Sequence, residues 1–363
     1  MRVKLEDVCE RGSSNIKQSD IIKMSGNYPI YGASGLAGKV NFYHQEQPYV
    51  AVVKDGAGIG RTTLNPAKSS VIGTMQYLIP KKNVLPEYLF YAVSYMHLEK
   101  YYTGATIPHI YFKDYKNEEF NLDNIEKQLE IIDVLGRCKK VIEARKQELV
   151  ELDRLMKARF VEMFGDPIQN PKGWEVVTIG DIVTEVRYGT SKPAVEGGKY
   201  PYLRMNNLTA DGHLDLNDLK YIDIPDDEIE KCVVRKGDVL FNRTNSIELV
   251  GKTAVFDLPE DMIIAGYIIR VRLTEKMLPE VLSQYMNLEA LKGILRGMAK
   301  GAVNQANINA QELQSIKVYI PEMELQKQFV KMKEQIYKSK VAVQKALDET
   351  QILFDSLMQK YFG

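Results

Sequence analysis

The chain of 363 residues carries 48 Lys and Arg against 48 Asp and Glu, so its formal net charge is zero. Hydrophobic residues make up 45% of the sequence and charged residues 26%, which is typical of globular domains and excludes a disordered or membrane-embedded chain. A chain of this length is expected to form two or three domains, each with its own core.

Cysteine and histidine are sparse and scattered. Cys9, Cys138 and Cys232 form no CxxC pair, which is typical of reduced thiols in a cytoplasmic protein. The four histidines show no metal-ligand spacing, and no apolar run is long enough to cross a bilayer. We therefore expect a cytoplasmic protein that has no membrane partner, no metal and no cofactor.

Residues 1–122 are expected to form a compact mixed α/β segment. The β-branched stretch 49–53 (YVAVV) predicts a buried strand, and Asp55-Gly56 directly after it is a hairpin signal. Residues 70–80 predict another strand. Residues 86–100 predict a helix, because apolar residues recur there at three- and four-residue steps.

Residues 123–165 predict one long helix. Apolar residues recur every three or four positions and charged residues fill the rest, which is the pattern of a narrow helix–helix seam. Asn121 and Asp123 are candidate N-caps, while Gly165 and Pro167 mark the end. A helix of about 40 residues spans roughly 60 Å.

Residues 166–320 repeat the order of the first segment, with insertions. Residues 238–242 and 266–272 predict strands, and 279–296 has helical spacing. A second long helix is expected over 321–363.

The two long helices are copies of one another. When the sequence is shifted by 198 positions, Gln128 falls on Gln326 and Phe164-Gly165 falls on Phe362-Gly363, without a gap. Such self-similarity at a fixed offset determines architecture. It indicates a globular module followed by a long helix, written twice.

The expected fold is therefore α+β. Two mixed, β-rich globular domains (1–122 and 166–320) are separated by two long antiparallel coiled-coil helices (123–165 and 321–363), with an internal pseudo-two-fold repeat. Each helix has an apolar stripe to bury, and its own copy is the simplest partner. The residues expected in the helix seam or in subunit docking are Leu129, Ile132, Ile142, Leu149, Leu152, Phe160, Phe329, Ile336, Val343, Leu347, Leu353 and Leu357.

No segment is strongly basic. The net charge is +3 over 1–122, from 14 basic and 11 acidic residues, and −4 over 166–320, from 18 basic and 22 acidic residues. If the chain binds DNA, its cations are gathered on one face or a partner supplies most of the phosphate neutralisation.

Two glycine-rich stretches resemble nucleotide loops and are rejected. Residues 55–61 (DGAGIGR) place Arg61 where G-x-G-x-x-G needs glycine, and no helical pattern follows. Gly251-Lys252-Thr253 matches the end of a Walker A box, but Ser246 stands at its first glycine and a strand pattern follows. No catalytic constellation is found, so we expect no enzymatic activity.

What remains is recognition chemistry on equivalent turns of both modules. Asn and Gln amides can read adenine bidentately, Arg can read guanine, and Tyr or Thr can contact phosphate. The candidate residues for binding DNA are Tyr31, Lys54, Arg61, Thr106, His109, Tyr188, Lys192, Arg204, Asn206, Arg243, Asn245, Lys300, Asn304 and Gln305.

The order module–helix–module–helix, with GATIPHI at 104–110 and GAVNQANI at 301–308 before the helices, resembles the specificity subunit of type I restriction–modification systems. The helix openings NIEKQ and EMELQKQ add to this resemblance. It implies that each module is a target recognition domain reading one half of an asymmetric bipartite site in double-stranded DNA. It also implies that the helices set the spacing and dock two methyltransferase subunits, that restriction subunits join, and that this subunit has no catalysis of its own.

The chain departs from that family in two ways. The helix openings lack the usual double proline, and the first module is shorter than the second. Alternatives are a specificity subunit of a methylation-only or type IIB-like system, a coiled-coil scaffold with two binding heads that does not bind DNA, and a stand-alone enzyme.

Overall fold

The computed structural model describes residues 1–104, 108–302 and 305–363, with the side chains of 300–302 and 305 left aside. The chain divides into two compact units. Unit 1 comprises Met1–Lys146 and Gln344–Gly363, and unit 2 comprises Gln147–Val343. Each unit thus contains a globular module and one half of each long helix.

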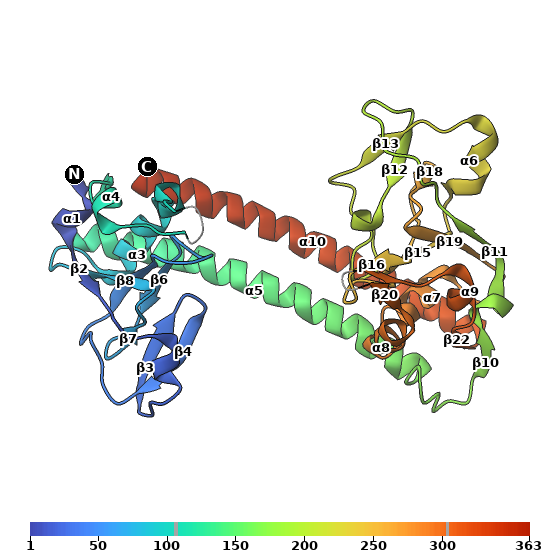
Figure 1. Cartoon of the computed structure of the whole chain (residues 1–363), viewed down its shortest axis with the longest axis horizontal. Helices are drawn as coiled ribbons and strands as arrows, with labels where there is room; N and C mark the ends of the chain where they lie inside the picture. The colour runs from blue at the N-terminus through green and yellow to red at the C-terminus, as the bar shows by residue number, and fades with distance from the viewer. Residues whose placement is uncertain (105–107, 303–304) are drawn as a thin grey trace. The chain divides into compact units, whose positions relative to one another are not determined.

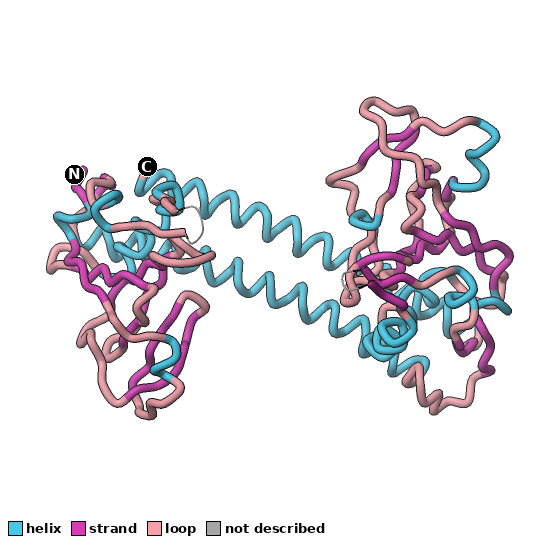
Figure 2. Tube along the Cα trace, in the orientation of Figure 1, coloured by secondary structure: helices cyan, strands magenta, loops and turns pink. Residues whose placement is uncertain are grey.

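The two long helices are α5 (Ile125–Phe164) and α10 (Met323–Phe362), each of 40 residues. Both are unbroken (Figure 2), which confirms the prediction from the 198-residue repeat. The N-cap of α5 is Asn124, since its Oδ1 accepts a hydrogen bond from the Lys127 N–H at 2.9 Å. The predicted caps were Asn121 and Asp123, so the observed cap lies one residue after Asp123. Gly165 ends the helix as expected, with a φ of +89°.

Inside each unit the helix halves run antiparallel. In unit 1, Arg145 of α5 donates to the hydroxyl of Thr350 in α10 at 2.8 Å, and Leu135 shares a core cluster with Met358. In unit 2, Asp153 pairs with Lys340 at 2.6 Å, and the rings of Phe160 and Phe329 lie 5.3 Å apart. In each unit, contacts further along α5 involve earlier residues of α10.

The described residues of unit 1 form three sheets and several short helices (Figure 1). The sheets have the strand orders β2-β8-β5-β6, β4-β3-β7 and β1-β9. The strands are β1 (Arg2–Lys4), β2 (Cys9–Ser13), β3 (Tyr28–Gly32), β4 (Gly35–Val40), β5 (Tyr49–Val53), β6 (Thr62–Asn65), β7 (Ser70–Val71), β8 (Met75–Pro80) and β9 (Glu119–Asn121). The helices are α1 (Leu5–Val8), α2 (Gln18–Ile21), α3 (Pro86–Tyr95), the 3-10 helix η1 (Leu98–Tyr101) and α4 (Phe112–Tyr115).

Strand β5 is the centre of unit 1, and all five of its residues are buried. Because successive side chains of a strand point to opposite faces, Val50 and Val52 pack with α3 and the long helices. Tyr49, Ala51 and Val53 pack on the other face against β7 and β8. The predicted strand over 49–53 is confirmed.

Unit 2 follows the same plan with additions. Its sheets have the strand orders β11-β19-β15-β17, β13-β12-β18-β14, β10-β22 and β16-β21-β20. The strands are β10 (Glu175–Thr178), β11 (Val183–Tyr188), β12 (Tyr200–Leu203), β13 (Lys220–Ile222), β14 (Val233–Val234), β15 (Val239–Asn242), β16 (Thr244–Asn245), β17 (Thr253–Val255), β18 (Met262–Ile264), β19 (Ile268–Leu273), β20 (Lys300–Ala302), β21 (Gln305–Asn307) and β22 (Lys317–Ile320). The helices are the 3-10 helices η2 (Ile179–Ile182) and η3 (Met205–Asn207), together with α6 (Asp226–Cys232), α7 (Pro279–Met286), α8 (Glu289–Met298) and α9 (Ala310–Gln314).

Three predicted elements differ from those observed. The strand over 70–80 is two strands, β7 and β8, separated by a turn in which the Gly73 N–H donates to the Ile16 carbonyl. The helix over 86–100 ends at Tyr95, because His97 adopts a left-handed φ of +49°. The helix over 279–296 is divided into α7 and α8 by Asn287, whose amide bonds to the backbone of Thr253 in β17. At Gly73 and Asn287 a long-range contact overrides the local period, whereas at His97 the backbone conformation itself ends the helix.

Candidate nucleic-acid interface

Each unit has a corner directly after its central strand. In unit 1, the Lys54 N–H donates to the Thr74 carbonyl, and the Ile110 N–H donates to the Lys54 carbonyl, both at 2.9 Å. In unit 2, Arg243 makes the same pair of bonds, to the Tyr267 carbonyl and from the Ile308 N–H, again at 2.9 Å. Ile110 and Ile308 differ by the repeat offset of 198. Lys54 and Arg243 therefore occupy equivalent positions, each at the end of a buried strand.

The next position along each chain ties this corner to the segment that precedes the long helix. In unit 1, Asp55 Oδ1 lies 2.6 Å from His109 Nδ1, and the two residues form a β-bridge. In unit 2, the Thr244 hydroxyl donates to Asn307 Oδ1 at 3.0 Å, and these residues also pair in register. Different side chains thus make one equivalent contact in both units.

Unit 2 contains a cleft of about 570 Å³ beside its corner. Four of the predicted residues line it: Lys192, Arg204, Asn206 and Arg243. The Arg243 guanidinium lies 4.9 Å from the centre of the Tyr188 ring, which brings a fifth predicted residue to its edge. Tyr202, Met205 and Tyr267 also line the cleft, and the sequence patterns did not single them out.

The cations of this cleft differ in how far they are neutralised. Lys192 pairs with Glu228 at 2.8 Å, and Arg204 pairs with Asp218 at 2.7 Å. The hydrogen bond from Arg204 holds the pKa of the Asp218 carboxyl below its usual range. Within the described part of the chain, Arg243 has no carboxylate at ion-pair distance; it contacts the Tyr188 ring and the Gly266 carbonyl. Of these three cations, Arg243 is therefore the one that can bind an anionic ligand without first losing a carboxylate partner.

The predicted residues of unit 1 form two pairs of neighbours. Arg61 is exposed and donates to the carbonyl of Ala33, two residues beyond Tyr31 at the end of β3. His109 binds Asp55, which follows Lys54, and stacks on Tyr111 at 6.3 Å. Tyr31 is half-buried against the core of β5.

The remaining predicted residues have weaker or no structural support. Asn245 uses both ends of its amide inside the chain, donating to Asn242 and accepting from the Ser246 N–H. Thr106 and Asn304 lie outside the described residues. Lys300 and Gln305 belong to β20 and β21 through their backbone, and their side chains are likewise outside the description.

The predicted residues of the long helices divide by burial. Five of them are buried: Ile142, Phe160, Phe329, Ile336 and Leu347. Ile132, Leu149, Leu152, Val343 and Leu357 are half-buried. Leu129 and Leu353 are exposed at 56% and 52%, and the buried positions near them are Ile131 and Met358.

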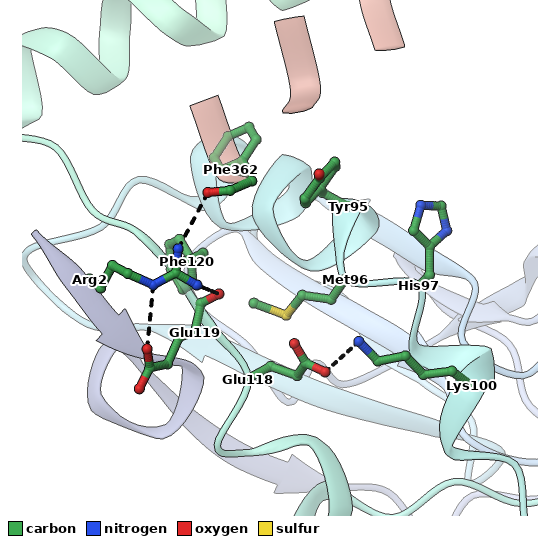
Figure 3. A pocket seen from close by; sticks show the side chains of 10 residues that line it. Arg2, Tyr95, Met96, His97, Lys100, Glu118, Glu119, Phe120 and Phe362 are labelled. Carbon is green, nitrogen blue, oxygen red and sulfur yellow. Dashed lines mark hydrogen bonds and ion pairs between the residues drawn. The ribbon is translucent and has the colours of Figure 1, made fainter. Parts of the chain in front are cut away.

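Another cavity lies in unit 1 and has a volume of about 410 Å³ (Figure 3). Its charged side chains are already paired with one another. Arg2 contacts the Glu119 carboxylate at 3.4 Å and the Gly363 carbonyl at 3.3 Å. Lys100 pairs with Glu118 at 2.5 Å. Because its cations are neutralised, this cavity is a poorer candidate for an anionic ligand than the cleft beside Arg243.

The described ranges show neither a metal site nor a membrane-spanning helix. They contain no group of three or more His, Cys, Asp or Glu side chains placed to hold a metal ion. None of the helices in the same ranges is both long and apolar enough to cross a membrane.

The sequence is similar to curated proteins over part of its length. It is 29% identical over 189 residues to the type I restriction enzyme EcoKI specificity subunit of Escherichia coli K12, covering 50% of this chain and 40% of that protein. In three curated relatives, the aligned part makes up 35–40% of the relative's own length.

Solved structures share the fold over the whole chain. The S subunit of a type I restriction–modification system from M. genitalium aligns with a TM-score of 0.63 at 15% identity, covering 100% of this chain and 96% of that one. A chain from a structure of the type I R-M system aligns with a TM-score of 0.58 at 18% identity, covering 99% and 97%.

The family model described as the type I restriction modification DNA specificity domain matches residues 1–154 and 171–350. These two matches follow the internal repeat and together span most of the sequence. The chain belongs to the type I restriction modification DNA specificity domain family.

Proposed function

We propose that this protein is the non-catalytic specificity subunit of a type I restriction–modification enzyme, and that it recognises an asymmetric bipartite site in double-stranded DNA. The observation that carries the proposal is the equivalent corner in the two units, with Lys54 in one and Arg243 in the other. Each corner places a cation at the end of a buried strand. Each unit would read one half of the site.

The chemistry of the unit 2 cleft supports contact with DNA. A guanidinium without a carboxylate partner can bind a phosphate or donate two hydrogen bonds to the O6 and N7 atoms of guanine. Stacking on Tyr188 holds the plane of Arg243 and reduces the side-chain entropy lost on binding. Lys192 and Arg204 would first have to release their carboxylate partners before they could bind a phosphate. We therefore assign the main contact with DNA to Arg243.

The exposed apolar side chains of the long helices support docking of other subunits. On α5 they are Ile125, Leu129, Val134, Val141, Val150, Leu155 and Val161, and on α10 they are Tyr337, Val341, Ile352 and Leu353. A partner that packs along the helices would remove these side chains from water. We propose that two methyltransferase subunits cover these faces and that restriction subunits join the assembly.

The chain's charge agrees with shared DNA binding. Its net charge is zero, whereas a protein that holds DNA alone neutralises many phosphates with its own cations. The partners would supply much of that contact, and the assembly would act in the cytoplasm where the chromosome lies.

Methylome sequencing tests the proposal. The gene is expressed with its methyltransferase subunit in a host that lacks the mark, and methylated adenines are mapped. We expect one two-part motif with a fixed spacer, absent when this chain is deleted. A methylome without a bipartite mark that depends on this chain would overturn the proposal.

A further inference from the structure

The two glycine-rich stretches rejected as nucleotide loops are one structural motif present twice. The tripeptides 60–62 (Gly-Arg-Thr) and 251–253 (Gly-Lys-Thr) each lead into the strand that pairs with the central strand. In unit 1, the Val53 N–H donates to the Arg61 carbonyl at 2.9 Å; in unit 2, the Asn242 N–H donates to the Lys252 carbonyl at 2.8 Å.

The glycines complete the correspondence. Gly60 and Gly251 each donate their N–H back to the last residue of the central strand at 2.9 Å. Their φ angles are +80° and +78°, which L side chains rarely adopt. Arg61 and Lys252 are therefore equivalent residues, although the repeat offset of 198 positions does not align them in the sequence.

In each unit, this cation extends from the sheet that contains the central strand to the turn that follows a strand of another sheet. Arg61 Nη1 donates to the carbonyl of Ala33, directly after β3. Lys252 Nζ donates to the carbonyl of Met205 at 3.0 Å and to that of Leu208, shortly after β12. Strands β3 and β12 correspond, since each forms a parallel pair, with β7 and β18 respectively.

Among the described residues, the ammonium of Lys252 donates only to these two carbonyls. Its side chain is 8% exposed, and its ammonium has carbonyl partners but no carboxylate among the described residues. Burial lowers its pKa. Burying an ammonium group is costly unless hydrogen bonds replace its lost hydration, and here the two carbonyls supply them. On its other side, Lys292 of α8 donates to the neighbouring Gly251 carbonyl at 2.5 Å and secures the same turn.

The carbonyls held by Lys252 belong to the wall of the cleft. Met205 is the first residue of the 3-10 helix η3 and Leu208 directly follows it, and Arg204, Met205 and Asn206 line the cleft together with Arg243. We propose that Lys252 is a positioning residue that holds segment 204–208 in place as the wall of this cleft, without itself contacting DNA. This inference rests on the proposed function for its consequence in recognition, but its structural part stands alone.

A phosphate-binding role for the Gly-Lys-Thr tripeptide does not fit this geometry. A Walker A lysine must reach a bound phosphate, and the box must open a helix. Here the ammonium points into the protein, the Thr253 hydroxyl donates to the Gly251 carbonyl at 3.1 Å, and strand β17 follows.

The structural part is tested by hydrogen–deuterium exchange on the full chain without DNA. Replacing Lys252 with methionine removes the ammonium that donates both hydrogen bonds and leaves an unbranched side chain only one atom shorter. We expect amide exchange in peptides covering 204–208 to rise about tenfold in Lys252→Met, and peptides of α10 to stay unchanged. Lys252→Arg should restore protection, because arginine serves at the equivalent position of unit 1.

The functional part is tested on the assembled methyltransferase and its mapped motif. Lys252→Met should relax discrimination at the half-site read by unit 2, leave the other half-site intact and keep the salt dependence of binding. The matched variant Arg243→Gln should leave exchange over 204–208 unchanged but reduce the slope of log K against log salt by about one, as loss of a phosphate contact does.

The possible failures can be told apart. Unchanged exchange over 204–208 in Lys252→Met would overturn the inference whatever the DNA result. A rise spread over all of unit 2, or a variant that does not fold, would show a general stability role and would also overturn it. A wild-type methylome without a bipartite motif would defeat the proposed function while leaving the exchange result meaningful.

Discussion

Gln128 and Gln326, which are 198 positions apart, make the same three hydrogen bonds. Each Oε1 accepts from a backbone N–H at 2.9 Å, of Leu85 in unit 1 and Leu278 in unit 2. Each Nε2 donates to two carbonyls, one in the loop before the module's helix and one just before the long helix. Both side chains are fully buried. A single amide in each unit thus fastens the start of a long helix to its module.

Replacing either glutamine with leucine should be strongly destabilising. The substitution leaves one backbone N–H and two carbonyls buried without partners, and we expect a loss of about 2–4 kcal/mol in the free energy of unfolding. Chemical denaturation of Gln128→Leu and Gln326→Leu measures this. Gln147→Leu on the exposed face of α5 is the control and should change stability by less than about 0.5 kcal/mol. Equal effects for all three would contradict the fastening role.

The equivalence of Lys54 and Arg243 predicts matched effects on separate half-sites. Lys54→Gln and Arg243→Gln should each weaken DNA binding by the assembled complex about tenfold, because each removes one cation at the edge of its unit. Competition binding with duplexes altered in one half-site measures which half is affected. Arg137→Gln removes a cation on α5 that pairs with Asp133, and it should leave binding unchanged. Loss at the same half-site for both variants would refute the equivalence.

Lys340 joins the module of unit 2 to both long helices. Its ammonium pairs with Asp153 of α5 at 2.6 Å and with Asp211 of loop 209–216 at 2.7 Å, while His213 of the same loop stacks on Tyr337 at 4.4 Å. Lys340→Met should reduce stability by about 1–2 kcal/mol and speed proteolytic cleavage in this loop. Lys345→Met, exposed on α10, is the control. Unchanged cleavage in Lys340→Met would show that the stack holds the loop alone.

The same cluster predicts behaviour in acid. Burial by itself would raise the pKa of Asp211, but the hydrogen bonds from Lys340 and Thr209 lower it to about 2. The carboxylate therefore contributes stability that is fully present above the ordinary value of 3.8 and is lost as the pH falls towards 2. Denaturation of Asp211→Asn between pH 5 and 2 should show a shallower loss than the wild type.

Lys292 predicts a rise of stability with pH in the basic range. Burial lowers the pKa of its ammonium to about 7 from an ordinary 10.5, with a further lowering from Arg296 and a partial opposing effect of Glu289. Between these two values the unfolded chain binds the proton and the folded chain does not, so stability rises with pH from about 7 to 10. Lys292→Met should stabilise unit 2 at pH 6 and flatten the rise.

Thermal unfolding between pH 6 and 10 measures this rise. Lys338→Met, exposed on α10, should keep the wild-type profile. A profile for Lys292→Met that is parallel to the wild type would mean that the other buried lysines, Lys252 and Lys333, account for the slope.

The long helices should act as a spacer ruler. Inserting seven residues after Lys146 in α5 and seven after Val343 in α10 adds two turns to each helix, or about 10.5 Å, and keeps the facing sides nearly in phase. At 3.4 Å per base pair, the spacer between the half-sites should lengthen by about three base pairs. Methylome sequencing of the lengthened variant measures the spacer. An unchanged spacer would restrict the helices to binding partners.

Local pattern was sufficient to predict the helices and the duplication. The three- and four-residue period of α5 and α10 survives because each helix buries one continuous stripe, and the shift of 198 places Gln128 on Gln326. The buried strand β5 was equally readable, since five apolar residues in a row, four of them β-branched or aromatic, are typical of a strand buried on both faces. The resemblance to the specificity subunits rested on the same duplication, and the family model over residues 1–154 and 171–350 confirms it.

The sequence by itself thus determined the order of modules and helices, because periodicity and repeats are local properties. Only the tertiary structure decided which cations are free. Arg61, Arg204 and Arg243 look alike in sequence, but Arg204 pairs with Asp218, whereas Arg61 and Arg243 each donate to a carbonyl and Arg243 also lies over the Tyr188 ring. Lys252 and Arg61 became recognisable as equivalents only through their backbone partners. Hydrogen bonds and ion pairs between distant segments set these roles, and no local pattern encodes which distant partner a side chain will meet.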